Sequence, residues 1–201
     1  MSTVVSHYED FNEIEKKIWN LLSSAVSDRN SEFRTPVFIC GNDNDLDGRV
    51  VVLRKASQQN NFIQYHSDIR SSKIEKIKKN PNCSILFYGK QEKIQLRLKA
   101  ECTVHFNDEI TKESWENTGH ISRKCYLVTN GPGTESVTPT SGLDDKFDNF
   151  NYTKEESETG YKNFCVIRCK VKSIEWLYLA AKGHRRAIFD LENNKKNWLV
   201  P

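Results

Sequence analysis

The chain has 201 residues, of which 37% are hydrophobic and 28% are charged, and its formal net charge is +3. This composition is typical of one ordinary globular domain and excludes an intrinsically disordered chain. Lysine and glutamate are interspersed along the sequence instead of forming a concentrated basic tract, so a nucleic-acid partner is not expected.

The N-terminal stretch MSTVVSHYEDFNEIEKK has no cationic start followed by an apolar run, so no secretory signal is expected. Nothing in the chain approaches the roughly 18 consecutive apolar residues of a membrane-spanning helix, so no membrane association is expected either. These two features predict a cytoplasmic protein.

Six cysteines are scattered singly along the chain: Cys40, Cys83, Cys102, Cys125, Cys165 and Cys169. No second Cys/His pair stands at the spacing that zinc sites require, so we expect buried reduced thiols and no metal site. Reduced thiols also suit the cytoplasm.

The first predicted element is an amphipathic helix over residues 11–26, whose apolar side chains share one stripe. A basic helix is predicted at SSKIEKIKKN, where Asn80-Pro81 ends it, and a third helix over residues 109–128. Strands are predicted, in chain order, at TPVFIC, RVVVLRKA, NFIQYHS, CSILFYG, KIQLRLKAECTVHF, NFCVIRCKV, SIEWLYLA and HRRAIFDLE.

The polar segment GNDNDLDG is predicted to be a turn, and residues 130–152 form a Gly/Pro/Ser/Thr/Asp loop long enough to be mobile or functional. We find no internal repeat and no second hydrophobic core, so residues 1–201 are predicted to form a single domain. Strands joined by short turns favour a mainly β, antiparallel small barrel with flanking helices over repeated βαβ units.

A phosphate site is predicted in IQYHSDIRSSKIEKIKKNP, where a strand turns into a helix. The start of a helix carries unpaired backbone N–H groups and a positive dipole end, which favour an anion. Ser67, Ser71 and Ser72 would add hydroxyl donors there, and Lys73 would add charge. The alternative is ordinary helix capping followed by a solvated basic helix.

Arg49 and Arg54 bracket the apolar segment VVVL. Positions five apart on one strand point to opposite faces, so one guanidinium would face a pocket while the other reaches a neighbouring site. The alternative is two surface arginines at the ends of an apolar strand.

Several short motifs occur in one order: RVVVLR, HSDIRSSK, NPNCSILFY and Gln95 in KIQLRLKA. Together they resemble the pyridoxamine 5′-phosphate oxidase family and its FMN-binding split-barrel relatives. Near the C-terminus, SIEWLYLAAKGHRRAIFD and the final WLVP resemble the closing strands of that family, with Trp176 ten residues before Arg186. The resemblance extends from about residue 35 to residue 201 and implies an FMN-binding split β-barrel of antiparallel, Greek-key type.

The resemblance implies a role for each matched position. Arg49 and Lys73 would bind the FMN phosphate, helped by Ser67 and Ser72, and Gln95 would bond to the flavin ring. Trp176 and Arg186 would reach the flavin from the partner subunit of a homodimer. The resemblance also implies that the segment Val50, Val51, Val52 and Leu53 passes beside the flavin ring. Two further implied cofactor contacts, Arg54 and His66, are positions where this chain differs from the family.

The positions that bind substrate in the oxidases are mostly changed. Arg54 stands where they have a Lys, Trp115 falls roughly where they have a Tyr, and Arg123 matches a nearby Arg loosely. Lys182 replaces an Arg, whereas His184 keeps the adjacent His.

One phosphate position also departs from the family, because Ser72 replaces an Arg; whether Arg70 substitutes for it is left open. The leading hypothesis is a homodimeric, FMN-dependent oxidoreductase acting on a small molecule that the sequence does not identify. One alternative is a true pyridoxamine/pyridoxine 5′-phosphate oxidase producing pyridoxal 5′-phosphate. Another is a non-catalytic flavin- or haem-binding module, for which the dispersed histidines indicate no haem ligand.

Overall fold

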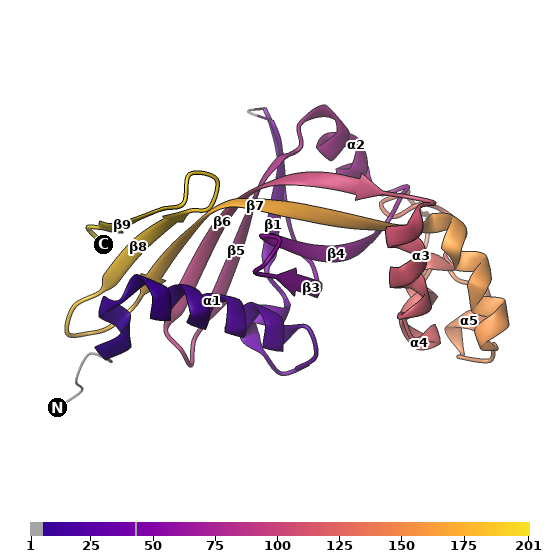
Figure 1. The fold of residues 1–201 in the computed structure, drawn as a ribbon. Helices are drawn as coiled ribbons and strands as arrows, with labels where there is room; N and C mark the ends of the chain where they lie inside the picture. The colour runs from indigo at the N-terminus through magenta and orange to yellow at the C-terminus, as the bar shows by residue number, and fades with distance from the viewer. Residues whose placement is uncertain (1–5, 43) are drawn as a thin grey trace.

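The computed structural model describes residues 6–42 and 44–201, and its centre is a nine-stranded sheet in which all pairs of neighbouring strands in the described residues are antiparallel (Figure 1). The strand order is β2-β1-β5-β6-β7-β4-β3, and β8 and β9 continue from β7 as a branch. The strands are β1 (Val37–Asn42), β2 (Asp45–Val50), β3 (Leu53–Ser57), β4 (Phe62–Asp68), β5 (Asn82–Gly89), β6 (Ile94–His105), β7 (Phe164–Tyr178), β8 (Arg185–Asp190) and β9 (Lys195–Leu199).

Strand β7 organises the sheet because it pairs with three neighbours. Along one edge, the first half of β7 pairs with β4 and the second half pairs with β8. Along the other edge, β7 pairs with β6. The sequence predicted two strands here, but no Gly or Pro interrupts NFCVIRCKVKSIEWLY, so the backbone continues as one strand. A register shift between Lys99 and Ala100 keeps β6 paired along this length.

The predicted strand RVVVLRKA is divided in the structure, which corrects the sequence prediction. Strand β2 ends at Val50 and β3 begins at Leu53, and the Val51 N–H donates to the carbonyl of Pro36 at 3.0 Å. Strand β2 forms a hairpin with β1, whereas β3 forms one with β4, so the two halves lie at opposite ends of the strand order. The alternation argument for Arg49 and Arg54 therefore does not hold, because they belong to different strands.

Helix α1 (Phe11–Ala25) covers one face of the sheet (Figure 1), and its bounds confirm the predicted amphipathic helix. The carboxylate of Asp10 caps it by accepting from the N–H groups of Asn12 and Glu13 at 2.8 and 3.0 Å. Ile14, Ile18 and Leu22 recur at helical spacing and are fully buried in the main core. Two short 3-10 helices flank α1, η1 (Ser6–Glu9) before it and η2 (Glu32–Arg34) after it.

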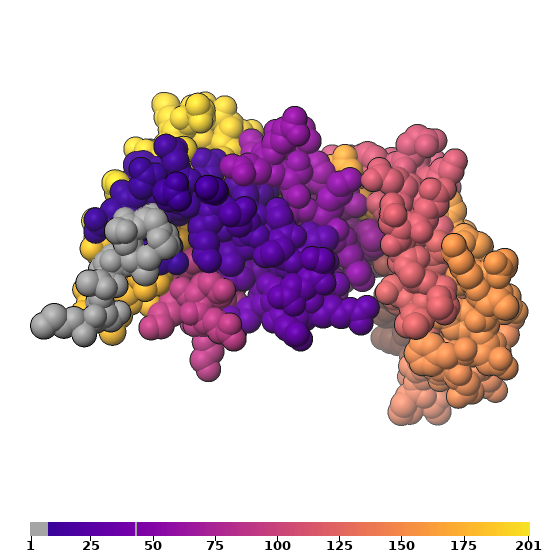
Figure 2. Space-filling view, turned by 60° about the horizontal axis from the view of Figure 1, so that its bottom comes forward, coloured from indigo at the N-terminus to yellow at the C-terminus, as the bar shows by residue number. Residues whose placement is uncertain are grey.

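Helix α2 (Ser72–Lys79) connects β4 to β5, and Asn80 ends it as predicted. Further helices form a segment between β6 and β7 that lies at one end of the sheet (Figures 1 and 2). These are α3 (Glu109–Glu116), α4 (His120–Arg123), η3 (Lys124–Tyr126), α5 (Asp145–Asp148), α6 (Lys154–Ser157) and η4 (Glu158–Asn163).

This helical segment differs from the sequence prediction in three ways. The helix predicted over residues 109–128 is divided at residues 117–119, where Gly119 precedes α4. The predicted loop over residues 130–152 contains α5. The segment also has a small core of its own, built from Trp115, Tyr126, Phe164 and Val166, which the sequence did not reveal because its members are far apart in the chain. None of the helices in the described residues is long and apolar enough to cross a membrane.

Candidate functional site

The strand-to-helix corner of the sequence folds into a buried cluster of cations and hydroxyls. Lys73, in the first turn of α2, donates from Nζ to Ser67 Oγ at 2.6 Å and to Ser71 Oγ at 3.0 Å. Arg49 reaches the same hydroxyl from β2, with Nη1 at 3.4 Å from Ser71 Oγ. We call Arg49, Ser67, Ser71 and Lys73 the cation–hydroxyl cluster. It joins β2, β4 and α2 at one point, as the resemblance implied for Arg49, Ser67 and Lys73.

The cluster carries more positive charge than its surroundings balance. Burial and then the nearby Arg49 lower the pKa of Lys73, whose side chain is 9% exposed. Arg49 forms an ion pair with Asp47, but among the described residues its buried Nε has no hydrogen-bond partner. A phosphate would supply both the missing acceptor and the missing charge.

Two residues near the corner take other positions. Ser72 is exposed on α2, facing away from the cluster residues Ser71 and Lys73, which are buried. Arg70 donates to both carboxylate oxygens of Asp68, at 3.0 and 2.7 Å, and to the carbonyls of Val128 and Thr129. Arg70 therefore holds the loop after η3 and is not turned to the cation–hydroxyl cluster in place of the missing family Arg.

Arg54 and His66 lie together on β3 and β4, and both line a hollow that also includes Gln64, Ser114 and residues of the α3–α4 turn. Burial, followed by the positive charge of Arg54, lowers the pKa of His66 from 6.5 to about 3, so the imidazole is neutral at physiological pH. The His66 ring packs edge-on against Phe164, with ring centroids 4.8 Å apart. Arg54 Nε and His66 Nδ1 are buried, and neither has a hydrogen-bond partner among the described residues.

A row of residues that includes the predicted Gln95 and Arg186 crosses the outer face of the sheet, opposite α1. Tyr88, Gln95, Leu177 and Arg186 are successive partners in the ladders of β5, β6, β7 and β8. Directly opposed residues share a face of a sheet, so these four side chains point the same way. Arg186 is held there by Glu175, with Nε and Nη2 at 2.9 and 2.8 Å from Oε1.

Trp176 does not belong to this row, which corrects its predicted placement. Its side chain is fully buried on the inner face, where its ring centroid lies 5.3 Å from that of Tyr8. A buried indole in this position is not available to a partner subunit. Leu177, one residue further, occupies the outer face between Gln95 and Arg186.

In the segment expected beside the flavin ring, the exposure of the side chains falls from Val50 to Leu53. Val50 is 65% exposed, Val51 and Val52 are half-buried, and Leu53 is buried in the core. Val50 opposes Val37 on the outer face of the β1–β2 hairpin. Val50 thus lies on the same face as Gln95, whereas Leu53 serves packing.

Trp115 and Arg123 are structural in this chain, although the resemblance implied contacts with a substrate. Arg123 is 1% exposed, lies over the Trp115 ring at 4.5 Å, and donates to the carbonyls of Trp115 and Thr118 at 2.8 and 2.9 Å. Trp115 Nε1 donates to Glu158 at 2.6 Å. These contacts occupy both side chains within the core of the helical segment. Lys182 and His184 are exposed in the β7–β8 turn.

Sequence reasoning did not single out Tyr88 and Leu177, and it named Ser71 only as a hydroxyl donor at the start of the helix. Ser71 immediately precedes α2, and this N-cap position favoured it over Ser72. Alternation along SIEWLYLA, read against the apolar inner positions of β7, would have placed Leu177 and not Trp176 on the face of Arg186.

The described architecture, a mainly antiparallel sheet with flanking helices, matches split-barrel structures. An FMN-binding protein related to pyridoxamine 5′-phosphate oxidase from Nostoc punctiforme PCC 73102 has a similar structure, with a TM-score of 0.73 at 16% identity over 92% of this chain and 96% of that one. PhzG from Burkholderia lata 383, solved in complex with tetrahydrophenazine-1-carboxylic acid, gives a TM-score of 0.72 at 12% identity over 100% and 99% of the two chains. At these identities the likeness shows the fold.

The first strands also show a likeness in sequence. Residues 17–106 match the family model described as pyridoxamine 5′-phosphate oxidase, FMN-binding domain. The matched segment contains the cation–hydroxyl cluster, Arg54, His66 and Gln95. A comparison with curated proteins found no match.

Proposed function

We propose that the protein is an FMN-dependent oxidoreductase that acts as a homodimer on a small-molecule substrate. The observation that carries the proposal is the cation–hydroxyl cluster, in which Lys73 and Arg49 converge on Ser71 without a carboxylate between them. FMN, when bound, supplies a ring that accepts and returns two reducing equivalents. The residues of this chain supply binding and orientation.

Buried polar atoms support the fit of FMN to this chain. Arg49 Nε, Arg54 Nε and His66 Nδ1 are three of the six buried side-chain atoms that lack a hydrogen-bond partner in the described residues. Buried polar groups are normally paired, so a concentration of unpaired ones indicates a ligand. All three belong to positions that the family uses for flavin or substrate.

A homodimer is supported by the division of the predicted contacts over two faces. The cation–hydroxyl cluster is buried beside α2, whereas Gln95 and Arg186 lie on the outer face, so two copies would together complete one site. The outer face also exposes apolar side chains, since Leu46 and Val50 on β2 are 69% and 65% exposed and Tyr88 is 50% exposed. Large apolar groups at one face are typical of an interface between subunits.

FMN is favoured over FAD because the cluster suits one terminal phosphate group. A pyrophosphate usually requires a Gly-x-Gly-x-x-Gly turn, and the sequence has no such motif. Lys73 and Arg49 would pair with the phosphate charge, and Ser67 and Ser71 would turn their hydroxyls to its oxygens.

Titration of the flavin-free protein with FMN and with FAD tests the proposal, with flavin fluorescence as the signal. We expect saturation by FMN at one equivalent per chain and much weaker binding of FAD. The visible spectrum of the protein as purified provides a second measurement. Tighter binding of FAD, or the absence of any flavin binding, would overturn the assignment.

A further inference from the structure

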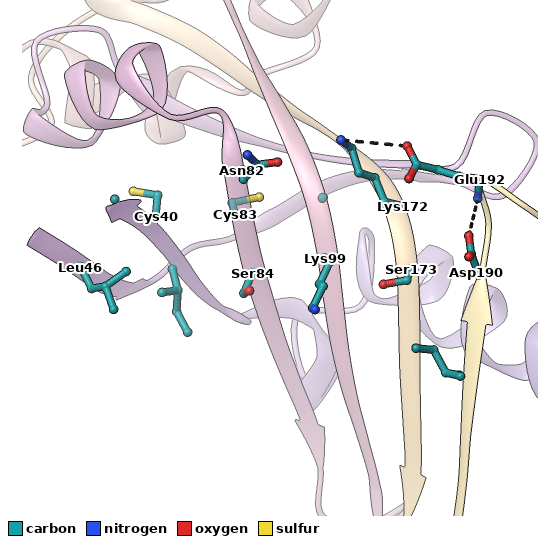
Figure 3. A pocket seen from close by; sticks show the side chains of 14 residues that line it. Cys40, Leu46, Asn82, Cys83, Ser84, Lys99, Lys172, Ser173, Asp190 and Glu192 are labelled. Atoms are coloured by element: carbon teal, nitrogen blue, oxygen red, sulfur yellow. Dashed lines mark hydrogen bonds and ion pairs between the residues drawn. The ribbon is translucent and has the colours of Figure 1, made fainter. Parts of the chain in front are cut away.

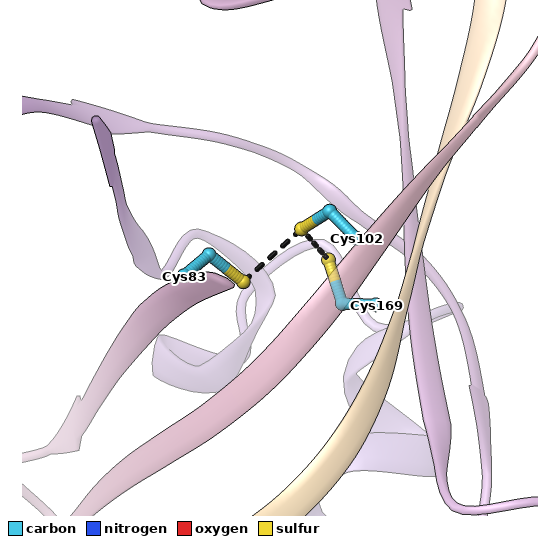
Figure 4. Close-up of side chains that lie close together, drawn as sticks. All are labelled: Cys83, Cys102 and Cys169. Atoms are coloured by element: carbon cyan, nitrogen blue, oxygen red, sulfur yellow. Dashed lines mark hydrogen bonds between the residues drawn. The ribbon is translucent and has the colours of Figure 1, made fainter. Parts of the chain in front are cut away.

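Three cysteine side chains converge in the interior of the sheet, although they are far apart in the sequence. Cys83 on β5, Cys102 on β6 and Cys169 on β7 turn their sulfur atoms toward one another (Figure 4). Cys102 Sγ lies 3.1 Å from Cys83 Sγ and 3.2 Å from Cys169 Sγ, and all three sulfurs lie within 4.8 Å of one another. We call these residues the three-thiol cluster.

The register of the sheet explains why the three thiols meet. Cys102 and Cys169 are direct partners across the β6–β7 ladder. Cys83 opposes Ala100, which lies two residues before Cys102 and therefore on the same face. All three side chains thus project into the inner face, where they are 8%, 5% and 0% exposed in chain order.

The surroundings of the cluster contain a further polar group. The Tyr65 hydroxyl is buried and has no hydrogen-bond partner in the described part of the chain. Burial and electrostatic interaction with the cluster raise the pKa of Tyr65 well above its ordinary value. The interior at this point is therefore polar and incompletely satisfied, unlike the apolar core around Ile14 and Leu22.

We propose that Cys83, Cys102 and Cys169 form a binding site for one thiophilic d10 metal ion, Cu⁺ or Zn²⁺. Sulfur atoms around such an ion at about 2.3 Å would lie roughly 3.8–4.0 Å apart, so the cluster needs to open by less than about 1 Å. Thiolates are the ligands that select these ions. Each ligand forms one metal–sulfur bond and gives its thiol proton, where present, to solvent. This site goes beyond the proposed flavin function and does not depend on it.

The two ions make different demands on the chain. Three sulfurs complete a trigonal Cu⁺ site, whereas a structural Zn²⁺ site takes four ligands. Cys40 is the partner of Cys83 across the β1–β5 ladder and is a candidate fourth ligand for zinc. Cys40 and Cys83 also border a hollow at the surface, together with Asn82, Lys99 and Lys172 (Figure 3).

The test uses the full-length protein, reduced and freed of metal under anaerobic conditions. Cu⁺ is offered from its bicinchoninate complex, and Zn²⁺ is offered separately against a chromophoric chelator. We expect one equivalent of at least one of these ions to be retained, with binding weakened by roughly tenfold or more in Cys102→Ala and in Cys169→Ala. Loss of zinc binding in Cys40→Ala, with copper binding kept, would assign Cys40 as the fourth zinc ligand.

Cys125→Ser is the matched control because it removes the exposed thiol and leaves the cluster intact. This variant should bind the ion as the unmodified protein does, and the bound ion should raise the denaturation midpoint of both proteins. The midpoint measurement also shows whether the alanine variants are folded. The proposal is overturned if the Cys125→Ser protein retains neither ion, or if folded Cys102→Ala and Cys169→Ala proteins bind it as tightly as the unmodified chain.

Discussion

Lys73 Nζ lies 2.6 Å from Ser67 Oγ, which ties the first turn of α2 to the end of β4. The pair brings a buried ammonium and a hydroxyl to one point beside Arg49, where burial and then the charge of Arg49 lower the pKa of Lys73. The predictions below begin from this pair.

Removing the ammonium should weaken FMN binding. A charge-assisted hydrogen bond contributes about 1.5–3 kcal/mol, so Lys73→Ala should raise the Kd for FMN by roughly 10- to 150-fold. Adding Arg49→Ala should raise it further. Lys78→Ala is the control, because Lys78 lies on the same helix but pairs with Glu75 at the surface. Equal affinities for the Lys73→Ala and Lys78→Ala proteins, measured by fluorescence titration, would remove Lys73 from the phosphate site.

His66 should make the stability of the fold sensitive to acid. Its pKa is about 3 in the folded protein and 6.5 ordinarily, so between these values the unfolded chain binds a proton that the folded chain does not. The free energy of unfolding therefore falls as the pH drops below about 6.5 and continues to fall toward pH 3. Denaturant titrations at several pH values should show a smaller loss for His66→Gln. An NMR titration of the His66 ring with a midpoint near 6.5 would contradict this explanation.

Arg123 should act on stability and not on flavin binding. Arg123→Leu leaves the carbonyl of Thr118 without its donor and removes the side-chain donor to the carbonyl of Trp115, which should cost about 2–4 kcal/mol of unfolding free energy. Arg29→Leu, at an exposed position, should cost little. Urea denaturation measures both, and FMN affinity should be the same in the two variants. A stable Arg123→Leu protein with weakened turnover would restore the substrate role implied by the family.

The outer face should carry the dimer contact. Val50→Asp places a charge on an apolar residue of this face, so we expect the variant to sediment as a monomer at micromolar concentration while the unmodified protein sediments as a dimer. Ile121→Asp is the control, because Ile121 is 60% exposed but lies in the helical segment. A monomeric unmodified protein, or a dimer unaffected by Val50→Asp, would place the interface elsewhere or remove it.

Oxidation of pyridoxine 5′-phosphate should be weak or absent. The family positions at Trp115 and Arg123 are occupied by packing, and Lys182 cannot stack on a pyridine ring as an Arg plane does. Two or three lost contacts of about 1.5–3 kcal/mol each should lower kcat/KM by hundreds-fold or more. Formation of pyridoxal 5′-phosphate under air is the assay. Turnover at ordinary enzyme rates with a micromolar KM would instead identify a true oxidase.

The sequence predicted most of the sheet, and it predicted that the residues of the strand-to-helix corner come together, because both depend on local patterns. The alternation of apolar and polar residues identified the strands. The residues of HSDIRSSK are close together in the chain, so they lie near one another whichever residue begins the helix. The sequence grouped Trp176 with Arg186 as flavin contacts, but a spacing of ten residues does not determine which face of the sheet a side chain occupies. Trp115 and Arg123 were misassigned because their partners, Glu158 and Phe164, are distant in the chain and become neighbours through packing alone.

The long central strand β7 has a consequence for how the chain reaches its folded state. Residues 164–178 pair with β4 and β6, which are synthesised far earlier, so neither strand gains its second neighbour until most of the polypeptide has been synthesised. Such long-range pairing slows folding and leaves strand edges open in the meantime. A ribosome-bound or truncated chain that ends before residue 164 would therefore carry the whole cation–hydroxyl cluster in its sequence and still depend on chaperones to keep it from aggregating.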